Sequence, residues 1–294
     1  MRTQQSLTIG ALGLLMINLP ANGWGPDGHH MVARLAVAAL PSDMPSFLVR
    51  DAERLVFLNY EPDSWRDAEE EALSPALHRG HDPDHHFQLE LFSVPDMPPD
   101  RYSFLRVLQR EGKDPATVGV LPYRAMELFQ RMRVGFRELR STQDKQTAAF
   151  LQARILDDAG ILGHYIADAA QPLHVTVNHN GWELPENPRN YTRDNTLHGR
   201  FEADFVHAHV HDGDVAARMR KVQPVGNGLA YIRAEIRRSH DQVVPLYELE
   251  NETRFDGTNN NPKAVAFGVE RLADAASTLR DFWYEAYRST VKRR

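Results

Sequence analysis

The sequence has 294 residues, 42% of them hydrophobic and 25% charged, and its formal net charge is −6. This is ordinary globular composition, which excludes disordered, collagen-like and coiled-coil proteins. Cysteine is absent, so the chain has no disulfide, thiolate metal site or cysteine nucleophile. Any metal chemistry must therefore use the 14 histidines and the carboxylates. The negative charge disfavours simple binding of polyphosphates, unless bound metal supplies positive charge.

Residues 1–23 have the pattern of a secretory signal peptide. A positive start, Met1–Arg2, precedes an apolar run from Ile9 to Ile17. That run is too short to span a bilayer. The small residues of Ala21-Asn22-Gly23 predict cleavage after Gly23, which makes Trp24 the first residue of a secreted or periplasmic protein. The alternative is a buried N-terminal helix.

The rest of the chain, 24–294, is predicted to be one all-α domain. No alternating strand pattern, repeat or Gly/Ser linker interrupts it. Two polar connections, 61–92 and 175–196, lack periodicity. Apolar residues at helical spacing predict helices over 29–40, 44–58, 122–140, 147–170, 197–209, 229–247 and 262–287.

The clearest chemical signal runs from His164 to His174. His164 and Asp168 are four residues apart, so they lie on one face of the predicted helix. Pro172 ends that helix and turns the chain, which allows His174 to return toward the same face. Two imidazoles and a carboxylate form a ligand set that suits zinc. The alternative is that these are surface or hydrogen-bonded histidines.

Two weaker elements add to this cluster. His198 and Glu202 again have spacing four, which also occurs in ordinary exposed pairs. After cleavage, the α-amine and carbonyl of Trp24 could chelate a metal, and His29 would add a ring nitrogen. The alternative is that Trp24 packs in the core and His29 starts a helix.

These motifs resemble those of a known superfamily. With Asp-x-x-Gln-Pro-Leu-His at 168–174 and Trp24 five residues before His29, the chain is similar to the S1/P1-type zinc-dependent nucleases, as a bacterial member. It more distantly resembles the bacterial zinc-dependent phospholipases C. The resemblance implies the all-α, multi-helix phospholipase C/P1 nuclease-like fold with a trinuclear zinc cleft.

The resemblance also implies three sets of zinc ligands. The family's Trp-x-Asp ligand matches Asp67, and its His followed by an aromatic residue matches His86, with His85 as the alternative. The implied sets are Asp67, His86, His164 and Asp168 for one ion; the Trp24 amine and carbonyl, His29 and the bridging Asp168 for a second; and His174, His198 and Glu202 for a third. Asp67 and Asp168 are the residues assigned to catalysis. The implied reaction is phosphodiester hydrolysis through a zinc-bridging hydroxide.

The substrate is less clear from the motifs. The nucleases stack a base on the aromatic residue, here Phe87, although core packing is an equal alternative. They also place an Asp two residues later, where this chain has Leu89, and an Arg three residues after the Trp-x-Asp aspartate, where it has Glu70. Arg66 is the remaining candidate to contact phosphate.

Two further features bear on the substrate. Glu202 is typical of the phospholipases, whereas the 24-residue separation of His174 and His198 and the short spacing from Trp24 to His29 are nuclease-like.

We therefore expect an endonuclease on single-stranded DNA or RNA, with a 3′-nucleotidase activity left open and no stable protein partner implied. One alternative is a zinc-dependent phospholipase C that acts on a phosphatidylcholine-type headgroup. An alternative of another class is a non-catalytic periplasmic zinc-binding protein, whose site would need no solvent-open position.

Overall fold

The computed structural model describes residues 24–92 and 97–291. These residues form helices and loops without a strand, which confirms the predicted all-α fold. The predicted signal peptide lies outside the described residues. Among the described helices, none is long and apolar enough to cross a membrane.

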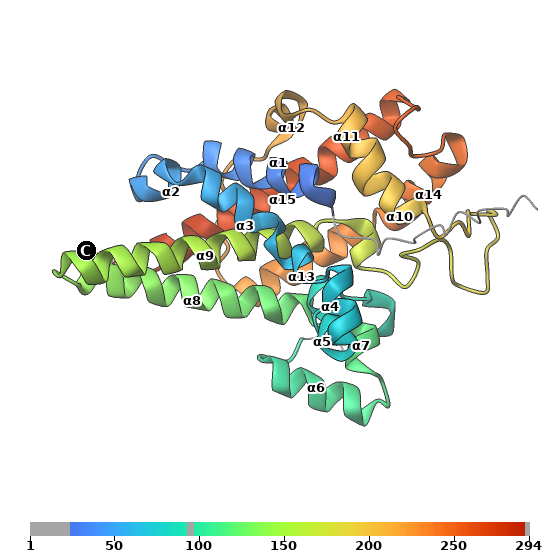
Figure 1. Ribbon diagram of the computed structural model, residues 1–294. Helices are drawn as coiled ribbons and strands as arrows, with labels where there is room; N and C mark the ends of the chain where they lie inside the picture. The colour runs from blue at the N-terminus through green and yellow to red at the C-terminus, as the bar shows by residue number, and fades with distance from the viewer. Residues whose placement is uncertain (1–23, 93–96, 292–294) are drawn as a thin grey trace, which may run out of the picture.

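The helices are labelled in chain order in Figure 1. Their bounds are α1 Gly25–Ala38, α2 Ser46–Arg50, α3 Ala52–Ser64, α4 Ala68–Leu73, α5 Pro75–Gly80, α6 Arg101–Arg110, α7 Pro115–Val118, α8 Leu121–Ser141, α9 Lys145–Ala169, α10 Leu197–Gly199, α11 Val206–His209, α12 Asp212–Arg218, α13 Gly228–His240, α14 Val243–Glu252 and α15 Pro262–Arg288. Short helical turns are η1 Asp82–His85, η2 Leu89–Leu91, η3 Pro172–His174 and the π-helical η4 Arg200–Phe205.

The long predicted helices agree well with the structure, and the differences have local causes. The helix predicted over 44–58 is divided at Asp51, whose φ of −102° and ψ of 30° leave the helical region, and its second part continues to Ser64. The helix predicted over 229–247 is likewise divided, between His240 and Val243. The polar connection 61–92 contains the short helices α4 and α5, which have no buried apolar face to predict them from.

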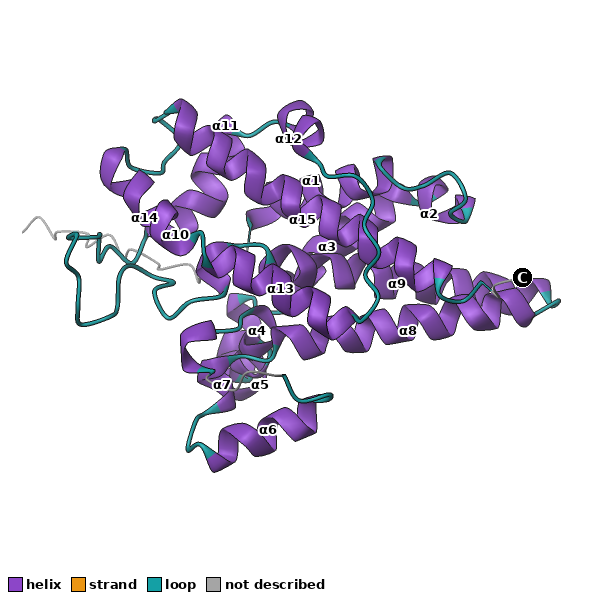
Figure 2. Cartoon of the chain, turned by 180° about the vertical axis from the view of Figure 1, so that it is seen from behind, coloured by secondary structure: helices purple, strands orange, loops and turns teal. Residues whose placement is uncertain are grey.

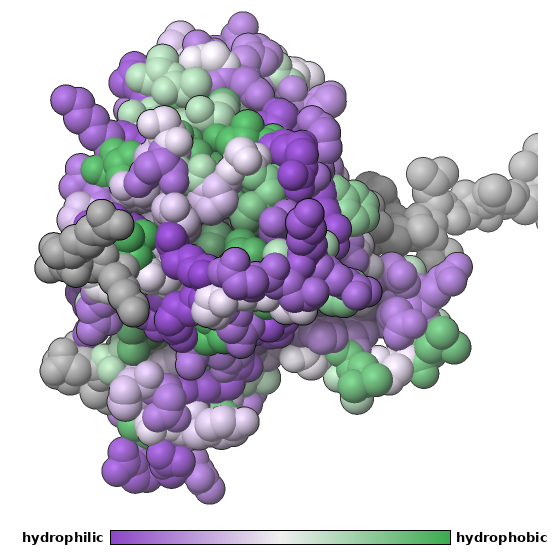
Figure 3. Space-filling model, turned by 90° about the vertical axis from the view of Figure 1, so that its left-hand side faces the viewer, coloured by the Kyte–Doolittle hydropathy of each residue, from purple (hydrophilic) through white to green (hydrophobic). Residues whose placement is uncertain are grey.

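Helices α8 and α9 form a long antiparallel hairpin that extends to one side of the molecule (Figures 1 and 2). Helices α1, α3 and α15 pack against α9 along its length. The hairpin tip lies at the left of Figure 1, and the face seen from that side is mostly hydrophilic, with smaller hydrophobic areas between (Figure 3). The C-terminal end of α9, which carries His164 and Asp168, therefore lies at the opposite end, against α3 and α1.

Two buried tryptophans attach neighbouring helices to the backbone of α9. The indole N–H of Trp24, just before α1, donates to the carbonyl of Ala167 at 2.9 Å. That of Trp283 in α15 donates to the carbonyl of Ala159 at 3.0 Å. Both side chains are fully buried, so these hydrogen bonds have no competition from water. They fix α1 and α15 relative to the helix that carries the clearest motif.

Close packing of α3 on α9 depends on small residues of α9. A Cβ on Gly160 would overlap the Cβ of Leu58 in α3, and it would also lie 3.4 Å from the carbonyl oxygen of Leu55. Neither contact involves the flexible end of a side chain, so the helices themselves would have to separate. The backbone approach at Gly160 therefore sets the distance between the two helices.

We expect Gly160→Ala to destabilise the protein by about 1–3 kcal/mol, as overpacking of a core does. The matched control is Gly213→Ala in α12, where an added Cβ meets nothing within 4 Å. The control is expected to be neutral or to stabilise by up to about 1 kcal/mol, because alanine is the better helix former. Urea unfolding of both variants measures the difference. Equal stabilities would show that Gly160 does not set the packing of α3 on α9.

Candidate metal centre

Most of the candidate ligands come from three pairs of polar residues, each with a spacing of four on one helix. Asp63 lies in the last turn of α3, one turn after Asn59. His164 and Asp168 lie in the last turns of α9, and His198 and Glu202 lie on the continuous α10–η4 segment. Spacing four places the members of each pair on one helix face. The remaining members, His29, His85 and His174, come from α1, η1 and η3.

The first group contains His29, Asp63, His85, His164 and Asp168, all with side chains buried. The Nε2 atom of His164 lies 2.9 Å from His85 Nδ1, 3.2 Å from Asp168 Oδ2 and 3.7 Å from Asp63 Oδ1. The His29 Nε2 atom lies 3.6 Å from Asp168 Oδ1 and 4.0 Å from Asp63 Oδ2. The His29 and His164 rings stack, with their centroids 4.1 Å apart.

Asp168 lies between the groups and uses its two oxygens differently. Its Oδ2 atom faces His164 and His85, the latter at 3.1 Å. Its Oδ1 atom faces His29 and the Nδ1 of His174, each at 3.6 Å. If ions were bound on both sides, this carboxylate could contact one with each oxygen.

The second group contains His174, His198 and Glu202. The Oε1 atom of Glu202 lies 2.7 Å from His198 Nε2 and 3.3 Å from His174 Nε2. The side-chain amide of Gln171 also donates to Glu202 Oε1. The Nδ1 of His174 donates to the main-chain carbonyl of His85 at 2.7 Å, so Nε2 is the ring nitrogen of His174 that faces Glu202.

The donor set fits metal ions. In seven of the eight residues, one buried side-chain atom has no hydrogen-bond partner in the described structure. These atoms are His29 Nε2, Asp63 Oδ2, His85 Nε2, Asp168 Oδ1, His174 Nε2, His198 Nδ1 and Glu202 Oε2. An unpaired polar atom costs free energy when it is removed from water. Seven of the eight buried ligand-type side chains thus have a polar atom that no hydrogen bond satisfies. Imidazole and carboxylate donors without thiolates suit zinc, among other divalent metals.

Burial keeps several imidazoles neutral, which is the state that binds metal. It lowers the pKa of His29 to about 3 and the pKa of His85 to about 4. It also lowers the pKa of His198 to about 4. These three rings carry no proton to be displaced near neutral pH.

Other members hold protons until a metal arrives. Burial raises the pKa of Glu202 to about 8. Burial also acts to lower the pKa of His164, but the carboxylates of Asp168 and Asp63 outweigh it and raise that pKa. The pKa of His174 is raised in the same way, against the effect of burial, by Asp168 and Glu202. Conversely, His164 and His174 outweigh burial and hold the pKa of Asp168 well below its usual range.

The structure does not bring Asp67 to this centre. Asp67 is exposed and caps α4, where its Oδ1 accepts the N–H of Glu70 at 2.8 Å. The carboxylate that joins the histidines is Asp63, four residues earlier and in the last turn of α3. Asp63 was missed because the family's Trp-x-Asp motif matched Asp67, and because the helix predicted to end at Leu58 continues through Pro62. The spacing of four between Leu55, Asn59 and Asp63, all buried on one face of α3, is the pattern that could have indicated the longer helix.

The structure also brings His85, the alternative, to the centre instead of His86. His85 is 3% exposed, whereas His86 is half-buried and its Nε2 lies 3.2 Å from the carbonyl of Ala116. The backbone of His86 is extended, and successive side chains on extended chain point to opposite sides. A shift of one residue therefore exchanges the inner histidine for the outer one.

The two predicted substrate contacts are both buried. Phe87 is 1% exposed and packs against Phe92 and Phe104, at ring-centroid distances of 5.7 and 5.9 Å. The core-packing alternative thus describes its position. Arg66 pairs with Asp63 and also with Asp82, the latter at 3.1 Å. Arg66 thus lies against the metal centre, with its guanidinium between a buried and a half-exposed carboxylate.

Trp24 lies beside both groups. Its indole donates to Ala167, the residue before Asp168, and its ring lies 5.5 Å from that of Phe201, the residue before Glu202. A Cβ on Gly28 would lie 2.7 Å from the Cβ of Trp24, so the glycine is needed for this close packing. The backbone of Trp24 is therefore anchored between the two segments that carry the candidate ligands.

The comparisons with known proteins add little to this geometry. No protein-family profile matches the sequence, and no curated protein matches it. Solved structures that match include the α-toxin of Clostridium absonum (11% identity, TM-score 0.38) and that of Clostridium perfringens from an avian strain (12% identity, TM-score 0.37). Each match covers 92% of this chain but only 65% and 64%, respectively, of the toxin chain.

Matched pairs of variants test which residues hold metal. We expect Asp63→Asn and His85→Ala to lose bound zinc, because each removes an atom from the converging set. The controls are Asp67→Asn and His86→Ala, which are expected to retain it. Zinc per protein, measured by elemental analysis after dialysis, gives the answer. Zinc loss from the controls and not from the other two variants would exclude the ligand set described above.

Zinc binding to the metal-free protein is expected to release protons at pH 6.5. The groups whose pKa is raised, His164, His174 and Glu202, hold protons there that the metal must displace. The release should decline, and zinc affinity should rise, as the pH rises through about 8, the pKa of Glu202, because above it the carboxylate has lost its proton. Calorimetric titrations in buffers of different ionisation enthalpy measure this, and identical heats in all buffers at pH 6.5 would contradict it.

Proposed function

We propose that this chain is a secreted zinc-dependent phosphodiesterase that hydrolyses single-stranded DNA or RNA. The observation that carries the proposal is the buried centre in which Asp168 lies between two groups of histidines and carboxylates. Closely spaced divalent ions are the usual machinery for in-line displacement at a phosphodiester. In this proposal 24–294 is the catalytic domain, and it begins at Trp24 after removal of the signal peptide.

The ligand set of the proposal combines the resemblance with the geometry. Asp63, His85, His164 and Asp168 hold one zinc ion. His29, the Trp24 amine and carbonyl, and Asp168 hold a second, and His174, His198 and Glu202 hold the third. Bound zinc supplies Lewis acidity and lowers the pKa of water toward neutrality. The protein's part is to keep the ligands neutral or ionised as required and to exclude bulk water from them.

Aligned on Asp63, the motif keeps the arginine of the nucleases, although Glu61 takes the place of their Trp. The nucleases that the sequence resembles place an Arg three residues after the aspartate ligand. When that ligand is Asp63, the third residue after it is Arg66, whose guanidinium lies against Asp63. The acidic Glu70 no longer occupies this place. Arg66 is thus the residue that we assign to the substrate phosphate, with Asp82 holding the other side of its guanidinium.

The same correction changes the aromatic residue. With His85 as the ligand, the ring that follows it belongs to His86, not to Phe87. His86 is half-buried, and aromatic rings stack on bases of single strands. We therefore assign base stacking to His86 and leave Phe87 to the core.

One observation favours a second candidate, a phospholipase C on phosphatidylcholine-type lipids. Glu202, which is typical of those enzymes, is the carboxylate that joins His174 and His198. A non-catalytic zinc-binding protein would use the same buried ligands and turn over no substrate. The choice among the three rests on which substrate is cleaved.

A paired assay separates these functions. Zinc-loaded protein that begins at Trp24 is incubated with single-stranded DNA and RNA in one arm and with phosphatidylcholine in the other, each with and without a chelator. We expect chelator-sensitive cleavage in the nucleic-acid arm alone. Cleavage of lipid alone would replace the proposal with the phospholipase. Absence of turnover in both arms, with zinc bound, would favour the non-catalytic protein.

Asp168→Asn is expected to reduce phosphodiester cleavage by about 100-fold or more and to lose at least one zinc ion, because Asp168 faces both groups. The control is Asp157→Asn, which makes the same change on an exposed turn of α9, where Asp157 pairs with Arg54. Cleavage rates and zinc content of the two variants are compared. An Asp168→Asn protein with full activity and full zinc would remove Asp168 from the bridging position.

Residues left ahead of Trp24 are expected to weaken one metal site, because the α-amine becomes an amide that cannot coordinate zinc well. Zinc content of a protein that begins at Trp24 is compared with that of one that keeps two extra residues before it. We expect one fewer ion in the extended protein. Equal zinc content would show that the chain terminus is not a ligand.

A further inference from the structure

Asn59 is buried at the centre of the first group and contacts two of its histidines. It lies on α3, one turn before Asp63, and is 0% exposed. Its side-chain Oδ1 lies 3.1 Å from Nδ1 of His29. Its main-chain carbonyl oxygen lies 2.8 Å from Nδ1 of His164. One residue thus meets histidines of α1 and α9 through two different oxygens.

These contacts determine which ring nitrogen faces the metal centre. A carbonyl oxygen only accepts hydrogen bonds, so each histidine must donate its Nδ1–H to Asn59. In a neutral imidazole the other nitrogen, Nε2, then carries the lone pair. The Nε2 atoms of His29 and His164 are the ones that lie near Asp168 and Asp63. Asn59 therefore holds both rings in the tautomer and orientation that metal binding needs.

The position of the Asn59 amide is itself fixed by the packing of α9. A Cβ on Gly163 would overlap the Nδ2 atom of Asn59, so the amide lies directly against the α9 backbone at a position that only glycine allows. The two rings that it contacts stack with an interplanar angle of 15°. The amide, the glycine and the stacked rings thus form one rigid unit.

We propose that Asn59 is a positioning residue that holds His29 and His164 for two adjacent metal ions. The proposal rests on the metal centre proposed above. The two contacts of Asn59 can be tested separately. Substitution of the side chain removes the contact to His29, whereas the main-chain contact to His164 remains. Loss of the side-chain acceptor should therefore weaken the ion held by His29 and spare the other two.

The test compares Asn59→Leu with Asn59→Asp. Leucine has no acceptor, whereas aspartate keeps an oxygen at the same place. In Asn59→Leu we expect the affinity for one of the bound zinc ions to fall by about 10–100-fold, the usual effect of losing a partner behind a metal ligand. We expect Asn59→Asp to retain it. Competition with a chelator of known affinity measures each ion, and Asn251→Leu on the exposed part of α14 is the control.

A second measurement does not need metal. In the metal-free wild-type protein, nitrogen-15 NMR of His29 should show the proton on Nδ1, and in Asn59→Leu this preference should be lost. Wild-type zinc affinity in Asn59→Leu would overturn the proposal, as would equal loss of all ions in both variants or a His29 proton on Nε2. If wild-type protein bound no zinc, the metal centre itself would fail, and the NMR result would still decide whether Asn59 fixes the tautomer.

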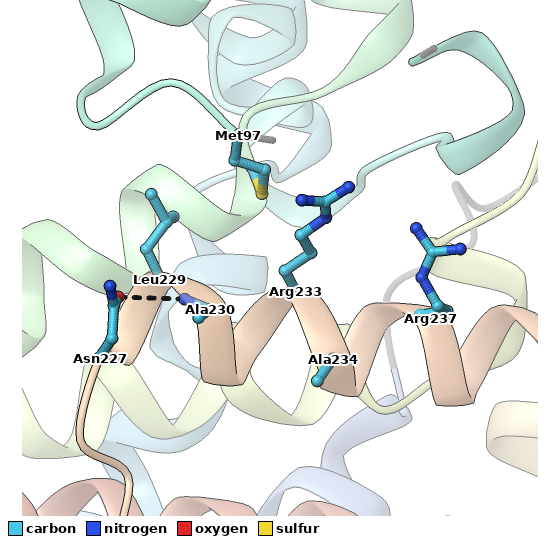
Figure 4. Close-up of a pocket in the computed structure, with 7 residues that line it drawn as sticks. All are labelled: Met97, Asn227, Leu229, Ala230, Arg233, Ala234 and Arg237. Carbon is cyan, nitrogen blue, oxygen red and sulfur yellow. Dashed lines mark hydrogen bonds between the residues drawn. The ribbon is translucent and has the colours of Figure 1, made fainter. Parts of the chain in front are cut away.

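A separate cavity on α13 carries a second inference. It has a volume of about 420 Å³ and is lined by Met97, Asn227, Leu229, Ala230, Arg233, Ala234 and Arg237. Figure 4 shows Arg233 and Arg237 one helical turn apart, with their guanidinium groups raised on the same side of α13 as Met97. The side chain of Asn227 accepts the N–H of Ala230 and caps the helix. The apolar lining residues, among them Met97 and Leu229, lie beside the guanidinium groups. This combination suits a ligand with an apolar ring and a phosphate.

Helix α13 connects this cavity to the edge of the metal centre. At its C-terminal end, Nε2 of His240 lies 2.9 Å from Oε1 of Glu90. The Glu90 carboxylate also accepts the N–H of Val177 at 3.1 Å, on the loop that follows His174. The helix also packs against η3, which contains His174. A strand that lies along α13 would therefore have one end near the metal centre and another near the two arginines.

We infer that Arg237, exposed at this cavity, binds a phosphate of the substrate strand away from the bond that is cleaved. This rests on the proposed nuclease function and concerns single-stranded nucleic acid, because a lipid headgroup has no second phosphate at such a distance. In a chain of net charge −6, the exposed guanidinium of Arg237 gives a local attraction for the phosphate backbone.

Substrate length tests this site. With zinc-loaded protein, we expect Arg237→Gln to raise KM for a long oligothymidylate by about 3-fold, in the range of an exposed ion pair, and to leave the kinetics on a dinucleotide unchanged. The salt dependence of KM on the long strand should fall by about one unit of slope. Arg137→Gln, on an exposed position of α8, is the control with the same charge change.

The inference would be overturned if Arg237→Gln had the same KM and the same salt slope as the wild type on the long strand. An equal loss on the dinucleotide would do the same, because it would place Arg237 at the cleaved bond or in the fold. If the wild-type protein cleaved neither substrate, the proposed function would fail first, and this outcome is distinct from a length-independent variant of an active enzyme.

Discussion

The structure depends on the burial of three carboxylates, Asp63, Asp168 and Glu202. In the described part of the chain, Asp63 has one arginine partner, Arg66, and the other two pair with no lysine or arginine. The exposed fractions of the three residues are 2%, 0% and 1%. Buried anions are costly unless they are paired and hydrogen-bonded. Five histidines surround them, but several of the facing atoms lack hydrogen bonds. Divalent cations would satisfy these atoms and offset the negative charge together, which makes metal binding the economical explanation for the whole arrangement.

Helical geometry places these groups with few residues. Each of α3, α9 and the α10–η4 segment contributes two polar residues at spacing four near an end of the helix. Long apolar faces on α8, α9 and α15 bury the rest of the chain and hold those ends in place. Trp24 and Gly163 then bring α1 and α3 close enough for their side chains to meet α9. The rigidity of the centre therefore comes from the core that surrounds it.

Much of the fold and of the centre could be predicted from the sequence. The helices around His164 and over 262–287 are long and strongly periodic, and their ends are marked by Pro172 and Pro262. The pairs His164–Asp168 and His198–Glu202 are local, so helical spacing alone places each pair on one face. The approach of the separate pairs to one another is long-range, and only the resemblance indicated it.

The errors came from registers that local pattern does not determine. Matching the family's Trp-x-Asp motif at Trp65 placed the candidate carboxylate at Asp67, four residues after Asp63. To choose between His85 and His86, one must know which side of an extended chain faces inward. The residues adjacent in sequence do not determine this. Asn59 is a neutral side chain, so no rule for metal ligands singles it out, and its role follows only from the atoms that it contacts.

The central claim is that this buried cluster binds metal through Asp63, His85, His164, Asp168 and their neighbours. X-ray diffraction from crystals of zinc-loaded protein beginning at Trp24, recorded on both sides of the zinc absorption edge, tests it most directly. The account predicts anomalous peaks between these side chains and between His174, His198 and Glu202. Peaks at Asp67 and His86, or a buried cluster without any peak, would contradict it.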